Sequence, residues 1–254
     1  MKVKDHYERA AKRRSTRLMS DIYDPAWKNH NRRLYHLDKI FRHYCKQKKV
    51  IDLGCGTGIW SHIVADYSKS VTGVDFALNN IKISKTLAKE KGLTNVKFVV
   101  ADIGNIKNFV SQKYGVIICI SVLQHLHDKE LFLKSLNPFL EKEGVIILLV
   151  HNKDCFFNYR EYRAKKNNSE IEINDYLFFS DLEKIINKSG LTISNARFTW
   201  SCFEDIFYLL GENKIGVVIR NYLHKISMSI ELLIGRYRIF RFFFRESILI
   251  IRRT

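Results

Sequence analysis

Residues 50–58 read VIDLGCGTG, an apolar run that ends in three glycines at alternate positions. The apolar run predicts a short buried strand. Glycines directly after such a strand let the backbone turn sharply and approach a ligand closely, and the helix that follows presents free N–H groups. Their G-x-G-x-G spacing differs from the G-x-G-x-x-G spacing of dinucleotide-binding domains. The stretch therefore predicts a strand, a ligand-binding loop and a helix, and it disfavours the alternative of an NAD-binding domain.

Strand and helix patterns alternate outward from this stretch. The runs 114–121 (YGVIICIS) and 144–150 (GVIILLV) are almost purely apolar, as expected for strands buried on both faces of a sheet. Alternation of this kind predicts an α/β fold, in which a parallel sheet is covered by helices on both faces. The expected strands are 50–53, 70–75, 96–101, 114–121, 144–150, 191–200 and 246–253, and the expected helices are 34–44, 59–67, 78–91, 129–140 and 181–189, the last closed by Gly190.

Carboxylates stand at three successive strand ends. Asp52 lies just before the glycines, Asp75 ends the second strand, and Asp102 follows the third. The carboxyl ends of parallel strands share one edge, which is where open α/β sheets bind ligands. Asp75 is therefore placed to accept both hydroxyls of a ribose, and Asp102 to accept from an adenine amino group.

Four segments in this order, VIDLGCGTG, VTGVD, VVADI and YGVIICISVLQHL, resemble the class I S-adenosylmethionine-dependent methyltransferases. The resemblance is closest to the small-molecule branch typified by quinone-biosynthesis methyltransferases. It covers residues 48–150, with weaker support from 181–200 and 247–253. The resemblance implies a Rossmann-like, seven-stranded, mostly parallel sheet with an antiparallel last strand, and S-adenosyl-L-methionine as the cofactor.

The resemblance also implies roles for individual residues. The three glycines would wrap the methionine part of the cofactor, and Asp52 would meet its amino group directly or through water. Asp75 would hold the ribose, and Ser121 would sit beside the sulfonium. The cofactor-binding residues expected on this basis are Asp52, Gly54, Cys55, Gly56, Gly58, Asp75, Phe76, Asp102, Ile103 and Ser121.

The residues that follow strand 114–121 limit the reaction. They read SVLQH, without the Asn/Asp-Pro-Pro-Tyr loop of adenine-methylating enzymes and without the Pro-Cys pair of RNA cytosine-C5 enzymes. Oxygen, carbon or non-adenine nitrogen acceptors remain. A hydroxyl acceptor needs in-line approach and a base, and histidine titrates near neutral pH. His125 and His151, which follow the fourth and fifth strands, are the candidate catalytic residues; the alternative for each is a hydrogen-bonded structural role.

The expected organisation is a methyltransferase core with additions at both ends. We predict a basic N-terminal helical lid at 1–47, a core at 48–200 with a lid insertion at 152–179, and an amphipathic helix and final strand at 201–254. An aromatic lid would suit a planar or hydrophobic acceptor. Tyr23, Trp27 and Tyr159 are the expected acceptor contacts, with ordinary packing as the alternative.

The chain is strongly basic, with a net charge of +17, and the excess is concentrated at its ends. Residues 1–49 hold 15 basic and 5 acidic side chains, and residues 236–254 hold 6 basic and 1 acidic, interleaved with aromatics. Such ends are typical of proteins that meet a polyanion, either an anionic membrane surface or RNA. A solvated basic surface is the alternative. The apolar stripe at 215–237 predicts an amphipathic helix that packs on the sheet or forms a homodimer contact.

Other features exclude several classes. No stretch of eighteen residues is free of charge, and the N-terminus has no apolar signal region. The five cysteines are scattered without a C-x-x-C pair, which indicates reduced thiols and no zinc site. We therefore expect a cytoplasmic protein, in peripheral contact with the inner membrane face, that holds no metal.

The function expected from these residues is S-adenosylmethionine-dependent methyl transfer to a small-molecule acceptor. O- or C-methylation of a lipid-linked, isoprenoid or glycan-type intermediate fits the aromatic lid and the basic ends. Two alternatives stay open: an RNA methyltransferase that uses the basic N-terminal arm, and a non-catalytic methyltransferase-like subunit.

Overall fold

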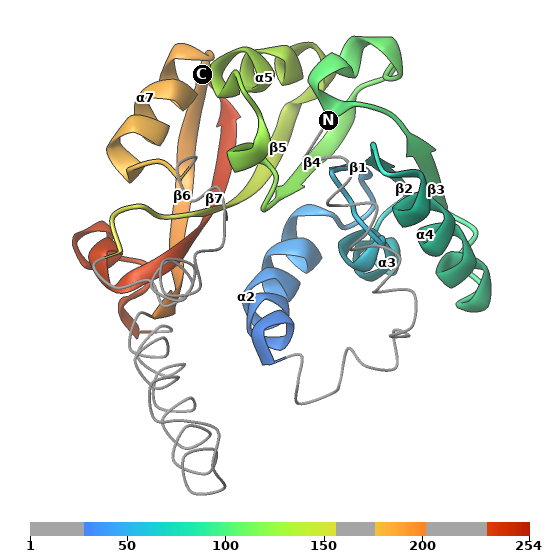
Figure 1. Cartoon of the computed structure of the whole chain (residues 1–254), viewed down its shortest axis with the longest axis horizontal. Helices are drawn as coiled ribbons and strands as arrows, with labels where there is room; N and C mark the ends of the chain where they lie inside the picture. Colours follow the sequence, from blue (N-terminus) through green and yellow to red (C-terminus); the bar gives the residue numbers. More distant parts are fainter. Residues whose placement is uncertain (1–27, 156–175, 202–232) are drawn as a thin grey trace, which may run out of the picture.

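The computed structural model describes residues 28–155, 176–201 and 233–254, which form one layered α/β unit (Figure 1). Its centre is a seven-stranded sheet in the order β3-β2-β1-β4-β5-β7-β6. β7 runs antiparallel to both of its neighbours, and the pairs among the first five strands are parallel. This arrangement confirms the predicted Rossmann-like sheet. The strands are β1 Lys49–Leu53, β2 Ser70–Asp75, β3 Val96–Val100, β4 Tyr114–Ile120, β5 Leu140–His151, β6 Leu191–Ser201 and β7 Phe244–Arg253.

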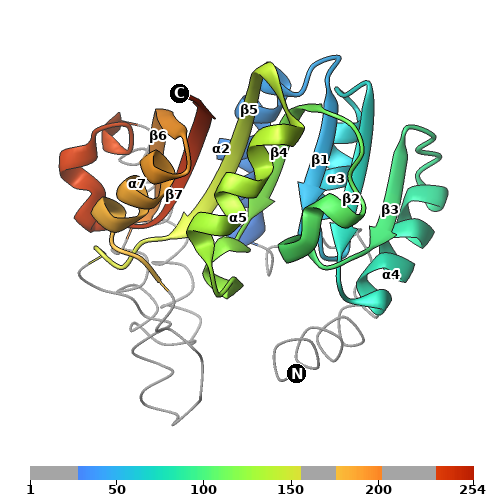
Figure 2. The ribbon, with the colours of Figure 1, turned by 90° about the horizontal axis from the view of Figure 1, so that it is seen from above.

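Helices cover both faces of the sheet. α5 and α7 lie on one side of the strands, and α2 and α3 lie on the other (Figure 2). All seven residues of β4 are buried, as the uninterrupted apolar run predicted for a central strand. Neighbouring residues of this strand serve the two sides alternately, since Ile117 belongs to the core under α5 and α7, and Ile118 to the core under α2 and α3. The helices are α2 Lys28–Tyr44, α3 Ile59–Ala65, α4 Leu78–Glu90, α5 Lys129–Leu136 and α7 Phe179–Lys188, with short 3-10 segments η3 Ile103–Asn108, η4 Leu123–His125, η5 Asn137–Phe139 and η8 Arg238–Phe243.

Three predicted boundaries are wrong by four residues or more. The helix expected over 34–44 begins six residues earlier, at Lys28. The helix expected over 129–140 ends at Leu136, because Pro138 cannot donate the backbone hydrogen bond that would continue it. The next strand then begins at Leu140, four residues before the predicted start at Gly144. Leu140 pairs with Tyr114 of β4. The register then shifts, and regular pairing begins at Val145 with Val116.

The carboxyl ends of the parallel strands gather at one edge of the sheet. β7 begins at this edge, because it runs antiparallel to β5 and places Glu246 opposite His151. α2 also begins here, since its far end leads into the amino end of β1. The predicted acceptor contacts Tyr23, Trp27 and Tyr159, and most of the 215–237 stripe, lie outside the described residues. In the part of the chain that the structure describes, no helix is both long and apolar enough to cross a membrane.

Candidate active site

The glycine loop after β1 has the backbone geometry that its sequence demands. Gly54 and Gly56 have φ values of +73° and +56°, in the left-handed region that favours glycine. A Cβ added to Gly54 would lie 2.4 Å from Val122 Cγ2, so the loop runs tightly against the chain leaving β4. A Cβ added to Gly56 would have no atom within 4 Å. The loop therefore leaves open space beside Gly56, where a ligand can approach the backbone closely.

Asp75, at the end of β2, is hydrogen-bonded to this loop. Its Oδ2 accepts from Gly56 N at 2.9 Å, and its Oδ1 accepts from Ala77 N at 2.9 Å and from Asn80 Nδ2 at 3.2 Å. The side chain is buried, and the half-buried Phe76 follows it. The carboxylate is thus fixed between the glycine loop and the start of α4.

Asp52, in β1, is buried beneath the loop. It is 1% exposed, and its Oδ2 accepts from Ser61 Oγ at 2.6 Å. Burial raises the pKa of the Asp52 carboxyl to about 7, against the opposing Ser61 hydrogen bond, and the negative charge of Asp75 adds to the rise. A cation bound beside Asp52 would stabilise its charged form. Cys55 is also buried, and burial raises the pKa of its thiol well above the usual value, so it is an inert thiol.

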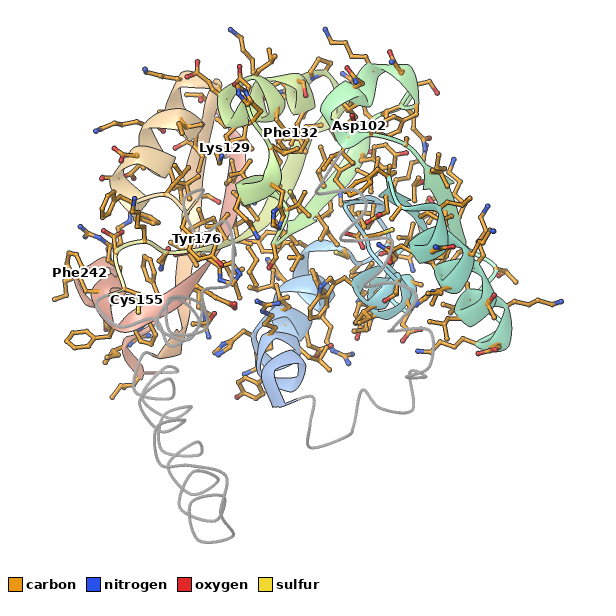
Figure 3. The ribbon with its side chains drawn as sticks, in the orientation of Figure 1. Asp102, Lys129, Phe132, Cys155, Tyr176 and Phe242 are labelled. Atoms are coloured by element: carbon orange, nitrogen blue, oxygen red, sulfur yellow. The ribbon has the colours of Figure 1, made fainter. Side chains whose placement is uncertain are left out.

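Asp102 and Ile103 follow β3 at the same edge. Ala101 N donates to Asp75 O at 3.1 Å, so Asp102 comes one residue after the last contact with β2. The Asp102 side chain is exposed, and its Oδ1 accepts from Gly104 N at 2.9 Å, which caps η3 (Figure 3). Ile103 is buried in the core.

Ser121, the first residue after β4, is held in an uncommon conformation. Its φ is +57°, a left-handed value that costs free energy for a residue with a Cβ and that collects at functional sites. Its backbone N donates to Leu149 O at 2.9 Å, which ties it to β5. Its Oγ is buried and has no hydrogen-bond partner among the described residues. The side chain of Gln124 donates to Ser121 O at 2.9 Å, and its own Oε1 is likewise buried without a partner there.

The two candidate bases lie in different surroundings. His125 is exposed on η4, with its Nε2 3.4 Å from Gln124 Nε2. His151 ends β5 and is buried, with its Nδ1 3.5 Å from Glu246 Oε1. Its ring stacks on Tyr176 at a centroid distance of 4.9 Å. A small cavity lies beside the carboxyl end of β5, lined by Leu123, Gln124, Lys129, Val150, His151, Tyr176, Leu177 and Leu182.

The structure thus places the glycine loop, Asp75, Ser121 and His151 along one edge, and it adds residues that the sequence interpretation missed. The sequence pattern places Glu246 only in a strand and Arg33 only in the N-terminal part of the chain. The available signal for Glu246 was an acidic residue at the start of an otherwise apolar strand, ESILII. Arg33 and Tyr176 had no signal of this kind, because their partners are distant in sequence.

Comparisons with known proteins agree with this geometry. The family described as "Methyltransferase domain" matches residues 45–190. The curated relatives include ubiquinone biosynthesis O-methyltransferases from Pelagibacter ubique (31% identical over 108 residues, covering 42% of this chain and 44% of that protein) and Haemophilus ducreyi (34% over 109 residues, 42% and 46%). The chain spans about half the length of the curated relatives it matches.

Solved structures show the same fold. Magnesium protoporphyrin IX methyltransferase from Synechocystis PCC 6803, with bound SAH, has a TM-score of 0.63 at 16% identity and covers 99% of this chain and 98% of its own. The [4+2]-cyclase SpnF has a TM-score of 0.60 at 16% identity, covering 89% and 83%. The resemblance inferred from the motifs is confirmed by the family match, which extends over more than half of the sequence. The chain belongs to the methyltransferase domain family.

Proposed function

We propose that this chain is an S-adenosylmethionine-dependent methyltransferase that acts on a small-molecule acceptor. The observation that carries the proposal is the meeting of an open glycine loop, two buried carboxylates and the left-handed Ser121 at one edge of a parallel sheet. Family membership and the names of the relatives support it. The likeness to SpnF supports the fold alone, so methyl transfer itself has to be measured.

Three features of the edge fit the cofactor. The buried carboxyl of Asp52 would be stabilised in its charged form by an ammonium group such as that of the methionine part. The open space at Gly56 admits a ligand against the backbone, and Asp75 presents its carboxylate beside that space for the ribose hydroxyls. The other contacts we propose are Gly54, Cys55, Gly58, Phe76, Asp102, Ile103 and Ser121.

When bound, S-adenosylmethionine supplies an electrophilic methyl group whose bonding electrons stay on sulfur as the methyl leaves. This chain must hold the acceptor in line with that bond and, for a hydroxyl acceptor, remove its proton. His151 is the better placed base, since it is buried at the end of β5 beside a carboxylate, whereas His125 is exposed. The base takes the hydroxyl proton while the acceptor oxygen forms the new bond to carbon.

The acceptor we propose is an isoprenoid, lipid-linked or glycan-type intermediate that is methylated on oxygen or carbon. The relatives named for ubiquinone biosynthesis favour the oxygen-directed reaction. Residues 1–47 and the insertion at 152–179 would then form the lid over the acceptor, with Tyr23, Trp27 and Tyr159 in contact with it. Residues 48–200 and 201–254 would form the core and its completion.

A peripheral contact with an anionic membrane surface belongs to the same proposal. η8, which leads into β7 at the active edge, exposes Ile239 (73%) and Phe242 (43%), which neighbour Arg238 and Arg241 in the sequence. Figure 3 labels Phe242 on this segment. Apolar and cationic side chains side by side are typical of segments that lie at a lipid headgroup interface. Both arginines also pair with protein carboxylates, so we expect weak, salt-sensitive binding.

The test is methyl transfer from tritiated S-adenosylmethionine by the purified full chain, with extract from a strain lacking the gene as the source of acceptor. Products are separated into organic-soluble, aqueous small-molecule, RNA and protein fractions. Label in either of the first two fractions supports the proposal. Label in RNA would favour the basic N-terminal arm as a nucleic-acid contact, and no label in any fraction would favour a non-catalytic subunit.

A further inference from the structure

A buried ion pair joins the first described helix to the last strand. Glu246 of β7 is 0% exposed, and Arg33 of α2 approaches it with both arms of its guanidinium. Arg33 Nε donates to Glu246 Oε2 at 3.0 Å, and Arg33 Nη2 donates to Glu246 Oε1. Although burial lowers it, the pKa of Arg33 is raised above its usual value by the charge and hydrogen bonds of Glu246. The guanidinium therefore stays charged, and its bidentate contact holds the Glu246 carboxylate in one orientation.

The same carboxylate faces His151. Glu246 and His151 are directly opposite in the antiparallel ladder of β7 and β5, so their side chains lie on one face of the sheet. The Oε1 that meets Arg33 is also 3.5 Å from His151 Nδ1. On the other side the imidazole stacks on Tyr176, with an angle of 29° between the rings. The ring thus stacks on Tyr176 by its face, and its Nδ1 lies within ion-pair distance of the carboxylate without a hydrogen bond between them.

This cluster adjoins the position of methyl transfer. His151 and Gln124 line the same small cavity, and the Gln124 side chain donates to the backbone of Ser121. A neutral imidazole carries one ring N–H, on Nδ1 or on Nε2. The hydrogen-bonding partner of one ring nitrogen decides which of the two carries the proton. A carboxylate opposite Nδ1 favours the proton there, which makes Nε2 the basic nitrogen.

We propose that Glu246, oriented by Arg33, is a positioning residue that keeps His151 protonated at Nδ1, so that Nε2 takes the proton of a hydroxyl acceptor. The inference rests on the proposed function and deepens it. The hydroxyl proton moves to Nε2, the oxygen lone pair forms the new bond to the methyl carbon, and the imidazolium later returns its proton to water. The carboxylate opposite Nδ1 stabilises that imidazolium while it exists.

A purely structural ion pair that anchors α2 is the competing explanation, because breaking any buried pair destabilises a protein. The tautomer of His151 distinguishes the positioning role from a purely structural one, since anchoring α2 does not depend on the tautomer. Long-range 15N–1H spectra of the 15N-histidine-labelled full chain, without cofactor, report the tautomer, and His151→Gln assigns the signal. We expect the Nδ1-protonated form in the native sequence and a mixture of both forms in Glu246→Gln.

Two further variants complete the spectroscopic test. Asp38→Asn removes the exposed pair with Arg42 and should leave the His151 signal unchanged. If Glu246→Gln does not fold, Arg33→Lys is the second variant. It keeps the positive charge but loses the bidentate contact with the carboxylate, and the mixture of His151 tautomers should appear in this variant. An Nε2-protonated His151 in the native sequence, or the same tautomer in every variant, would overturn the proposal.

Kinetics provide a second and separate readout. Glu246→Gln should lower kcat by about 10- to 100-fold, less than the roughly 100- to 10,000-fold that a positioned base supplies, with the Kd for S-adenosylmethionine changed less than about twofold. An unchanged kcat in a folded variant would refute the positioning role. If the native chain methylates nothing, the proposed function fails on its own, and the spectra still decide whether Glu246 sets the tautomer.

Discussion

Replacing Asp52 with Asn should make the ligand-free protein more stable at neutral pH but not in acid. Burial raises the pKa of the Asp52 carboxyl from its usual 3.8 to about 7, a shift of about 3 units, which corresponds to about 4 kcal/mol. The folded state therefore binds the Asp52 proton more tightly than the unfolded state does. Its contribution to stability is fully present below the unfolded pKa and is lost as pH rises towards the folded pKa.

The measurement is the free energy of unfolding from urea titrations between pH 4 and pH 8, for the native chain and for Asp52→Asn. The variant keeps a neutral side chain of the same shape, so the two proteins should differ little near pH 4. Asp52→Asn should become the more stable by up to about 4 kcal/mol near pH 8. Ser61→Ala is the companion variant: it removes the hydrogen bond that lowers the pKa of Asp52, so the loss of stability should extend to higher pH. A difference between Asp52→Asn and the native chain that does not change with pH would refute the raised pKa of Asp52.

Two further predictions concern the loop and the surface. Gly54→Ala should lower the free energy of unfolding by about 2–5 kcal/mol, because it adds overpacking of about 1–3 kcal/mol to the about 1–2 kcal/mol cost of its positive φ. Gly92→Ala shares the positive φ but has open space, so it should show only the smaller cost in the same thermal or urea unfolding experiment; equal losses would contradict the close packing of the loop. Ile239→Ser should weaken sedimentation with phosphatidylglycerol vesicles about tenfold, since losing one large apolar side chain from the interface costs at least about 1.5 kcal/mol. Leu131→Ser removes an exposed apolar residue (63%) from α5 and should have no effect, and equal effects of the two variants would contradict a lipid-facing η8.

Much of the core could be predicted because its signals are local. The apolar runs of β4 and β5 and the glycines after β1 each identify an element within a few residues. Asp75 could be placed by the rule that parallel strands end at one edge. The same local logic failed at Pro138, where apolar residues on both sides suggested a continuous helix and the missing backbone donor ended it.

The rest of the site depends on contacts between distant parts of the chain. Arg33 and Glu246 are separated by 213 residues, and nothing in either neighbourhood specifies the other. Their pairing follows from β7 inserting antiparallel beside β5, which places Glu246 opposite His151. The left-handed backbone of Ser121 is similarly a product of its surroundings, because serine has no intrinsic preference for that conformation.

The most direct test of cofactor binding at the carboxyl edge of the sheet is calorimetric titration of S-adenosylmethionine into the full chain, for the native sequence and for Asp75→Asn. We expect one cofactor bound per native chain. The affinity of Asp75→Asn should be at least about tenfold lower, because one lost charge-assisted hydrogen bond costs about 1.5 kcal/mol or more. Asp128→Asn, which changes an exposed carboxylate that caps α5, should bind as the native chain does. Absence of binding by the native chain, or equal affinity in Asp75→Asn, would contradict the placement of the cofactor at the carboxyl edge of the sheet.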